Sequence, residues 1–232
     1  MYLYETHLHT SPVSRCALWS VREAVEYYKN AGYAGIFVTN HFVDGNIAFP
    51  KDASYEAKIH FYFSDAEEAI RIGKEIGLDV FTGVEISNWG TDFLIYGLDK
   101  EWYLAHPEAY DMNKRELLEM MKDAGALVIQ AHPFREAGYI DHIRLYPRNV
   151  HGVEIDNANR TAFENEMARQ YSDNYRLLTF AGSDNHGEEE QVEFAGLQFE
   201  TPIADEADFV RRVLNGEINL FHKQMAPFCR GK

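Results

Sequence analysis

The sequence predicts a mixed α/β fold, a closed or distorted barrel of about seven strands with its active site at the carboxyl ends of the strands. Apolar, strand-like runs alternate with helical patterns along the whole 232-residue chain. There are about seven such runs, and nearly every one is followed by a residue that can bind a metal ion. Chemistry that collects after parallel strands is typical of a barrel and fits an open sheet less well.

The strand-like segments are short. We expect strands at residues 2–6, 35–39, 80–86, 93–97, 127–130, 152–155 and 178–181. The third and fourth of these flank Asn88-Trp89-Gly90, which predicts a hairpin-like pair instead of a strand–helix–strand unit. Helical segments separate the others, so most of the sheet should be parallel.

Helix signals fill the intervening segments. Ser20 with Glu23, and Ser64 with Glu67, have the spacing of a capping box, and the two helices should end near residues 32 and 77. Helical periodicity also marks residues 113–124, 162–171 and 207–214. No Gly/Ser-rich linker, charge block or repeat interrupts this pattern, so we expect a single domain over residues 1–232.

Composition narrows the class of protein. Apolar residues make up 46% of the chain, but no apolar run approaches the roughly 20 residues that cross a bilayer. The first residues lack the basic patch and apolar stretch of a signal peptide, and Cys16 and Cys229 set no disulfide framework. We therefore expect a cytoplasmic protein without a membrane partner. The sequence predicts no particular oligomeric state.

Charge limits the partners. The net charge is −15 at pH 7, and no group of Lys or Arg is long enough to follow a nucleic-acid backbone. We therefore expect no long nucleic acid as partner. A small phosphorylated substrate is compatible with this charge, because bound divalent cations reverse the local field of an acidic site.

Five segments place metal-binding side chains at the ends of predicted strands. Residues i and i+2 of a strand point to the same face, so His7 and His9 can share one metal ion or bind adjacent ions. Asp184 and His186 have the same spacing, and Glu85 is suited to bridge two ions. The expected metal ligands are His7, His9, His41, Glu85, His132, Asp184 and His186.

One histidine at a strand end is usually an ordinary polar residue, but seven potential ligands in five clusters indicate a metal site. Nitrogen and carboxylate ligands without thiolate suit divalent Zn, Mn or Fe, and the sequence does not choose among these metals. Cys16 lies in the loop after the first histidine pair but has no spaced partner. The histidines without a paired ligand are expected to be packing or surface residues: His60, His106, His142, His151 and His222.

The order of these motifs resembles a known family, the PHP (polymerase and histidinol phosphatase) domain, over about residues 1–190. The resemblance implies a distorted (β/α)7 barrel that holds two or three divalent metals with the seven ligands above and hydrolyses phosphate esters. Members often have an acidic or histidine ligand in the loop that is residues 11–16 here, and commonly Asp where Asn40 stands. The matching motifs are His7-Leu8-His9-Thr10, Thr39-Asn40-His41, Gly83-Val84-Glu85, Ala131-His132-Pro133 and Gly182-Ser183-Asp184-Asn185-His186.

The predicted function is a metal-dependent phosphoesterase, a phosphatase for a small phosphate monoester. A metal-bound water has its pKa lowered to about 7, so a metal-bound hydroxide is the expected nucleophile. The catalytic residues would be Glu85, which holds two ions, with Asp184 or His186 orienting the nucleophile. Arginine recognises phosphate in a bidentate manner, and Arg15, Arg135 and Arg160 each lie just beyond a strand-end motif.

Other functions stay open. The same chemistry would suit a phosphodiesterase or exonuclease on short nucleotides. A non-catalytic PHP-like regulatory module would account for the missing carboxylate in residues 11–16. A metal-dependent amidohydrolase is a further alternative, although no Lys stands at a strand end among these motifs.

Overall fold

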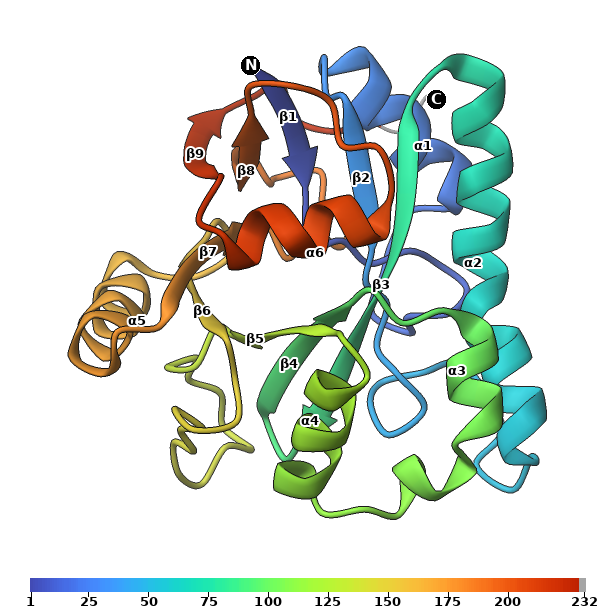
Figure 1. The fold of residues 1–232 in the computed structure, drawn as a ribbon. Helices are drawn as coiled ribbons and strands as arrows, with labels where there is room; N and C mark the ends of the chain where they lie inside the picture. The colour runs from blue at the N-terminus through green and yellow to red at the C-terminus, as the bar shows by residue number, and fades with distance from the viewer. Residues whose placement is uncertain (230–232) are drawn as a thin grey trace.

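The centre of the molecule is one sheet that curls towards a barrel (Figure 1). The computed structural model describes residues 1–229. Its strands are β1 (Tyr2–Glu5), β2 (Gly35–Val38), β3 (Asp79–Asn88), β4 (Thr91–Tyr96), β5 (Leu127–Ala131), β6 (Gly152–Asn157), β7 (Leu178–Gly182), β8 (Glu193–Phe199) and β9 (Asn219–Gln224). They form a nine-stranded sheet in the order β7-β6-β5-β4-β3-β2-β1-β8-β9.

Strand direction confirms the predicted barrel and its distortion. β1, β2 and β3 pair in parallel, as do β5, β6 and β7, whereas β4 is antiparallel to both of its neighbours. The ring closes beyond β1 and β7, where Leu8 forms a parallel bridge with Asn185. The His9 amide donates to the Asn185 carbonyl at 2.9 Å. Seven strands thus make the barrel, while β8 pairs antiparallel with β1 and β9 pairs antiparallel with β8.

Helices connect and cover the strands. Ser20 and Glu23 form the expected capping box at the start of the first helix. The capping box expected at Ser64 is wrong, because the aromatic segment before it is already helical and the Ser64 hydroxyl donates back to the Phe61 carbonyl. The helices are α1 (Val21–Asn30), α2 (Tyr55–Ile76), α3 (Lys100–Ala105), η1 (Pro107–Tyr110), α4 (Lys114–Asp123), α5 (Ala162–Tyr175) and α6 (Glu206–Leu214).

Aromatic side chains fill the barrel interior, and the predicted metal ligands lie at the carboxyl ends of its parallel strands. Tyr4, Phe37, Tyr96 and Phe180 are fully buried and pack with Phe209 of α6. The rings of Phe37 and Phe209 lie 4.2 Å apart, and each buried ring stabilises the fold by about 1.5–3 kcal/mol. This packing fixes the strands whose carboxyl ends carry the predicted ligands. Within residues 1–229, no helix is long and apolar enough to cross a membrane.

Candidate metal centre and active site

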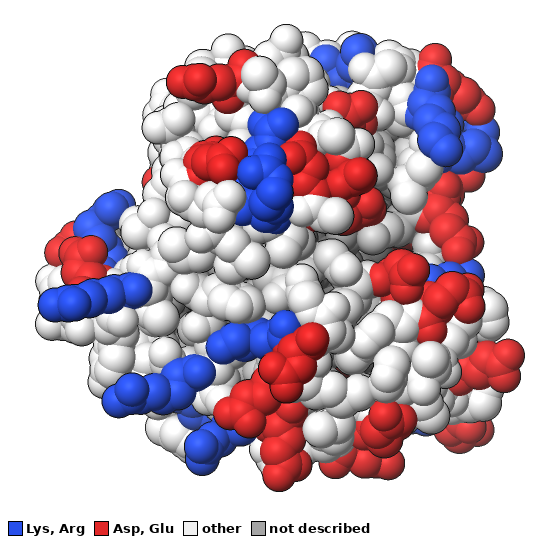
Figure 2. Space-filling view, in the orientation of Figure 1, with Lys and Arg blue, Asp and Glu red and all other residues white. Residues whose placement is uncertain are grey.

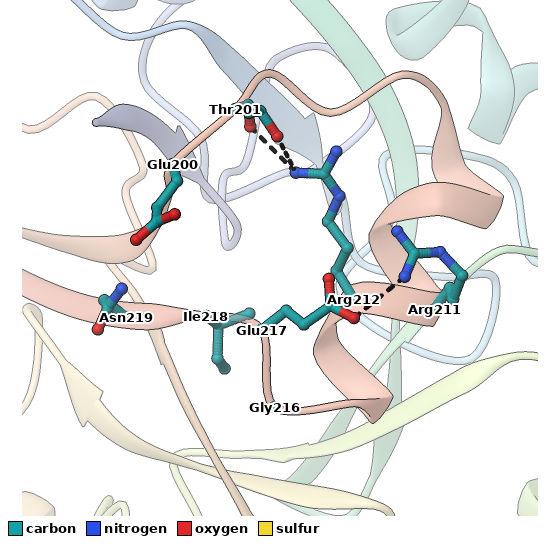
Figure 3. A pocket seen from close by; sticks show the side chains of 8 residues that line it. All are labelled: Glu200, Thr201, Arg211, Arg212, Gly216, Glu217, Ile218 and Asn219. Carbon is teal, nitrogen blue, oxygen red and sulfur yellow. Dashed lines mark hydrogen bonds and ion pairs between the residues drawn. The ribbon is translucent and has the colours of Figure 1, made fainter.

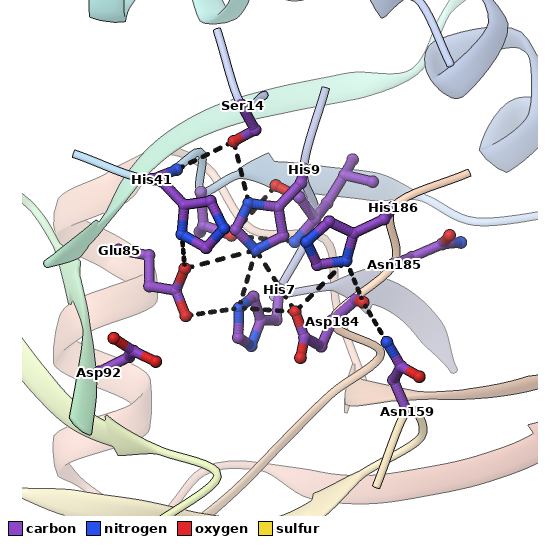
Figure 4. A network of polar contacts seen from close by, with 12 residues as sticks. His7, His9, Ser14, His41, Glu85, Asp92, Asn159, Asp184, Asn185 and His186 are labelled. Atoms are coloured by element: carbon purple, nitrogen blue, oxygen red, sulfur yellow. Dashed lines mark hydrogen bonds and ion pairs between the residues drawn. The ribbon is translucent and has the colours of Figure 1, made fainter. Parts of the chain in front are cut away.

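All seven predicted ligands meet at the carboxyl ends of the parallel strands. Figure 4 shows the members of this cluster other than His132 turned toward one another. His7 and His9 follow β1, His41 follows β2, and Glu85 lies within β3. The remaining three follow β5 or β7: His132, Asp184 and His186. A bridge between His41 and Glu85 extends the pairing of β2 with β3 to this point. The segments are distant in sequence, so the barrel alone brings these side chains together.

The ligand atoms face one another at short range. The Nε2 atoms of His7 and His9 are 3.2 Å apart. Oε1 of Glu85 lies 3.3 Å from Nε2 of His7 and 3.3 Å from Nε2 of His132. Oδ1 of Asp184 lies 3.5 Å from Nε2 of His7 and 3.4 Å from Nε2 of His9. Two carboxylates thus lie among three imidazoles, and Glu85 is placed to contact two groups at once.

The donor set fits divalent metal ions. Three groups have ligand atoms that lie within 4.8 Å of one another: His7, Glu85 and His132; His7, His9 and Asp184; and His9, His41 and His186. In residues 1–229, Nδ1 of His41 and Oε2 of Glu85 are buried without a hydrogen-bond partner. Buried polar atoms normally have a partner, and a cation between these groups would supply one.

In three of these histidines, Nδ1 contacts an oxygen atom on the side of the ring opposite Nε2. Nδ1 of His7 lies 3.0 Å from Oε1 of Glu154, and Nδ1 of His9 lies 3.1 Å from the Ser14 hydroxyl. Nδ1 of His186 lies 2.9 Å from the Asp184 carbonyl oxygen, which makes it the donor. Such contacts fix ring orientation and leave Nε2 available, as in metal-binding histidines generally.

Glu154 is a site residue that the sequence left unassigned within Glu154-Ile155-Asp156-Asn157. It is fully buried, and Oε2 accepts from the His132 amide at 3.1 Å and from Nδ2 of Asn157 at 2.8 Å. Asp156 points elsewhere and contacts Nδ1 of His222 at 2.7 Å. One carboxylate of β6 therefore orients both His7 and the backbone of His132. Residues i and i+2 of a regular strand share a face, and the break in register between Glu154 and Asp156 separates the two acids.

A second buried carboxylate ties β1 to β7 beneath the ligands. Oε1 of Glu5 accepts from the amides of Thr6, His7 and Ser183, each at 3.0 Å. Oε2 accepts from the Tyr28 hydroxyl at 2.8 Å. Burial raises the pKa of Glu5 to about 7 despite these donors. The contacts hold the two strand ends that carry four of the predicted ligands.

The backbone at two ligands is strained. His132 and Asp184 have φ values of 25° and 53°, in the region that favours glycine. Gly182 allows the close approach that the sequence indicated, since a Cβ there would lie 2.5 Å from the His7 Cβ. Residues in such conformations are kept by the surrounding structure and occur often at functional sites.

Electrostatics keep the two central carboxylates ionised. Burial opposes ionisation of Glu85, but the imidazoles of His41, His132 and His7 outweigh it and hold its pKa well below the usual range. Asp184 behaves in the same way, since His7 and His9 offset its burial and lower its pKa. Both groups therefore remain negatively charged at neutral pH and are competent cation ligands.

The loop of residues 10–16 is fixed by a polar network around Asn40. Its Oδ1 accepts from the Thr10 amide at 2.7 Å and from the Ser14 hydroxyl at 2.8 Å, while Nδ2 donates to Asp65 at 3.2 Å. An aspartate at position 40 would face Asp65 without a donor, which explains why asparagine suits this chain. The network turns Cys16 towards the ligands, with Sγ 3.2 Å from Nε2 of His41.

A cavity of about 900 Å³ opens above the ligand cluster. His41, His132, Asp184 and His186 line it together with Cys16, and so do Arg135 and Arg160. The exposed Trp89 and Tyr139 lie on its rim, and Lys114 and Asp44 form an ion pair in its wall.

The predicted phosphate-binding arginines divide into two kinds. Arg135 and Arg160 reach the cavity, and in the described part of the chain Nε of Arg160 is buried with no hydrogen-bond partner. Arg135 pairs with Asp92 at 3.0 Å. Arg15 does not line the cavity; it is exposed and donates to the Ile47 carbonyl at 3.2 Å. The structure therefore brings two of the three arginines to the ligands.

Asp92 was missed because β4 runs against its neighbours. Ligands are expected after parallel strands, whereas the start of an antiparallel strand lies at that same end of the barrel. Asp92 is buried, and its Oδ2 lies 3.9 Å from Nε2 of His132. The one sequence signal for this reversal of direction was the predicted hairpin at Asn88-Trp89-Gly90, directly before β4.

A second hollow, of about 520 Å³, lies at α6 and the start of β9 (Figure 3). Its arginines are already paired: Arg211 contacts Glu217 at 3.1 Å, and Arg212 donates to the Thr201 carbonyl at 3.1 Å. Guanidinium groups engaged in this way offer little to an incoming anion. The cavity beside the ligand cluster is therefore the stronger candidate for the functional site.

Comparisons with known proteins agree with a PHP-type α/β barrel. The PHP-associated family model matches residues 162–218. A two-domain protein from Bacteroides vulgatus that contains a predicted PHP-like metal-dependent phosphoesterase matches 95% of this chain with a TM-score of 0.67 and 15% identity. This chain spans 64% of the length of that protein. A predicted metal-dependent phosphoesterase from Bifidobacterium adolescentis has a TM-score of 0.57 and 14% identity, over 93% of this chain and 96% of its own.

A further similar structure is an amidohydrolase from Chromobacterium violaceum with sulfate bound and no metal, with a TM-score of 0.54 and 17% identity over 93% of this chain and 97% of its own. No curated protein matches the chain. At these identities the structural likeness shows the fold. The PHP-associated match over residues 162–218 agrees with the PHP-type motifs, and the neighbouring structures share the fold.

Proposed function

We propose that this protein is a metal-dependent phosphoesterase that hydrolyses a small phosphate monoester. One observation carries the proposal: Arg135 and Arg160 line the same cavity as His132, Asp184 and His186. Guanidinium groups beside a cation site suit a phosphate group, which needs both metal ions and hydrogen-bond donors. A cytoplasmic location, a single domain and a small phosphorylated substrate belong to this proposal.

The residues that would hold the metal ions are those already predicted. Glu85 with His7 and His132 forms one set, and Asp184 with His7 and His9 forms another, so two or three ions of Zn, Mn or Fe fit. Divalent ions supply Lewis acidity, which makes water a stronger acid and neutralises charge on phosphoryl oxygens.

The protein's own groups then position the substrate and move a proton. Arg160 has a free buried donor for a phosphoryl oxygen, and Arg135 adds a second guanidinium at the cavity wall. The ionised Asp184 carboxylate is placed to accept a proton from the attacking water. His186 donates from Nδ1 to the Asp184 carbonyl, so Nε2 is left to contact water or metal.

Two competing functions differ in their substrates. A phosphodiesterase for short nucleotides would share the metal cluster. However, Lys and Arg form separate groups interspersed with acidic residues on the face in Figure 2 and give no continuous track for a strand. The amidohydrolase neighbour keeps amide hydrolysis open as an alternative. No lysine belongs to the three ligand groups of the described chain.

The test uses three substrates with related nitroaryl groups: p-nitrophenyl phosphate, bis(p-nitrophenyl) phosphate and p-nitroacetanilide. Each is assayed with Zn²⁺, Mn²⁺ or Fe²⁺ and with the Asp184→Asn variant as background. We expect the monoester to be cleaved at least about tenfold faster than the diester, a transition-state preference of about 1.4 kcal/mol. Hydrolysis no faster than the variant, or preference for the diester or amide, would overturn the proposal.

A further inference from the structure

Cys16 lies beside two predicted metal ligands. Its Sγ is 3.2 Å from Nε2 of His41, and His186 lines the same cavity wall. The three residues come from separate segments of the chain, and all of them line the large cavity. Cys16 is half-buried and forms no disulfide. A thiol and two imidazoles thus converge at the mouth of the site.

The far nitrogen of each imidazole faces an oxygen atom. Nδ1 of His186 donates to the Asp184 carbonyl at 2.9 Å, and Nδ1 of His41 lies 2.5 Å from Oε2 of Glu85. Each ring therefore turns its other nitrogen towards Cys16. This is the arrangement in which a neighbouring oxygen orients a metal-binding histidine.

The spacing matches a metal ion with sulfur and nitrogen ligands. Zinc binds sulfur at about 2.3 Å and imidazole nitrogen at about 2.0–2.1 Å, so tetrahedral geometry separates the two ligand atoms by about 3.6 Å. The separation of Sγ from Nε2 of His41, 3.2 Å, needs only a small adjustment. The rings of His41 and His186 have centroids 6.0 Å apart, which leaves room for an ion between their nitrogens.

The loop holds Cys16 firmly in this place. The Arg15 amide donates to the Asn46 carbonyl at 2.9 Å, and the Ala17 amide donates to the Ser14 carbonyl at 3.1 Å. Ser14 in turn accepts from the His41 amide at 3.0 Å. The thiol therefore approaches His41 from a backbone fixed on both sides.

We propose that Cys16, His41 and His186 form a thiolate-containing metal site that prefers zinc, at the edge of the ligand cluster and open to the cavity. The inference rests on the metal dependence proposed above and adds a soft ligand to a set of nitrogens and carboxylates. Thiolate selects borderline-soft ions such as Zn²⁺ over Mn²⁺. The open side faces the cavity, where a substrate oxygen can bind.

Cobalt(II) substitution tests this proposal without relying on turnover. The wild-type protein loaded with Co²⁺ should show a sulfur-to-cobalt charge-transfer absorption, and Cys16→Ser should lose it together with about one metal equivalent per chain. Cys229→Ser is the matched control, because Cys229 is exposed and its thiol contacts the Pro227 carbonyl. Cys16→Asp should restore the lost equivalent but shift the preference from Zn²⁺ towards Mn²⁺.

Alkylation provides a second measurement. Zinc should slow the reaction of iodoacetamide with Cys16 while leaving Cys229 unaffected, because a metal-bound thiolate is shielded. An unchanged cobalt spectrum and metal content in Cys16→Ser, or no protection by zinc, would overturn the inference and favour a thiol that only hydrogen-bonds the two histidines. Absence of phosphate release from a protein that shows the cobalt–sulfur band would contradict the proposed function alone.

Discussion

Oε1 of Glu154 lies 3.0 Å from Nδ1 of His7, and both side chains are completely buried. A carboxylate on β6 thus fixes the orientation of an imidazole that follows β1. The opposite nitrogen of that ring, Nε2, faces His9, Glu85 and Asp184. The orientation of the ligand cluster thus depends on residues that contact the ligands, such as Glu154, as well as on the ligands themselves.

Replacing Glu154 with Gln should therefore weaken metal binding while leaving the fold intact. Loss of a carboxylate behind a metal-binding histidine typically costs about 10–100-fold in affinity. Competition with a chelator measures the change. Asp156→Asn is the control, because Asp156 lies on the same strand but contacts His222. Equal affinities for wild type and Glu154→Gln would remove Glu154 from the site.

Asp184→Asn should abolish hydrolysis. The amide keeps the size of the side chain but removes the charge that faces His7 and His9, and a proton acceptor contributes about 10²–10⁴-fold to the rate. Steady-state kcat at saturating metal measures the loss. Turnover close to that of the wild type would exclude Asp184 from the mechanism.

Arg160→Ala and Arg15→Ala form a matched pair. Arg160 lines the cavity with an unpaired donor, so its loss should raise KM for a phosphomonoester by about 10–100-fold, the value of a charged hydrogen bond. Arg15 donates to the Ile47 carbonyl outside the cavity, so its loss should leave KM unchanged. The opposite ranking of the two variants would restore the sequence-based prediction for Arg15.

Stability should fall with acid through His151. Its Nδ1 accepts from the Val128 amide at 3.1 Å, and burial together with nearby Lys122 lowers the pKa to about 4. In the unfolded chain the His151 imidazole has a pKa near 6.5. Between about pH 4 and pH 6.5 the unfolded chain therefore binds more protons at this residue than the folded chain does. The contribution of His151 is thus present above about pH 6.5 and is lost as the pH falls towards 4.

Urea unfolding at pH 7 and pH 5 measures this effect. His151→Asn keeps an acceptor for the Val128 amide, and it should reduce the loss of stability between the two pH values by about 1 kcal/mol, after allowance for partial exposure. His60→Asn serves as the control, since the His60 side chain is 52% exposed. Identical pH dependence in wild type and His151→Asn would refute the assignment.

The seven barrel strands and the convergence of the seven predicted ligands could be anticipated from sequence because both leave local signals. Apolar runs end at histidines and carboxylates, and a parallel barrel places those ends together. Asp92 could not be predicted because β4 is antiparallel, so its first residues and not its last lie at the ligand end of the barrel. Glu154 could not be distinguished from Asp156 without the register of β6. Cys16 offered no spaced partner, since its neighbours His41 and His186 are distant in sequence.

Metal content per chain, measured by elemental mass spectrometry on protein purified without a His-tag or chelator, tests the central claim most directly. The account predicts two or three equivalents of Zn, Mn or Fe, held by the histidines and carboxylates at the strand ends. Fewer than about half an equivalent, unchanged after incubation with each metal, would contradict it and favour a non-catalytic module.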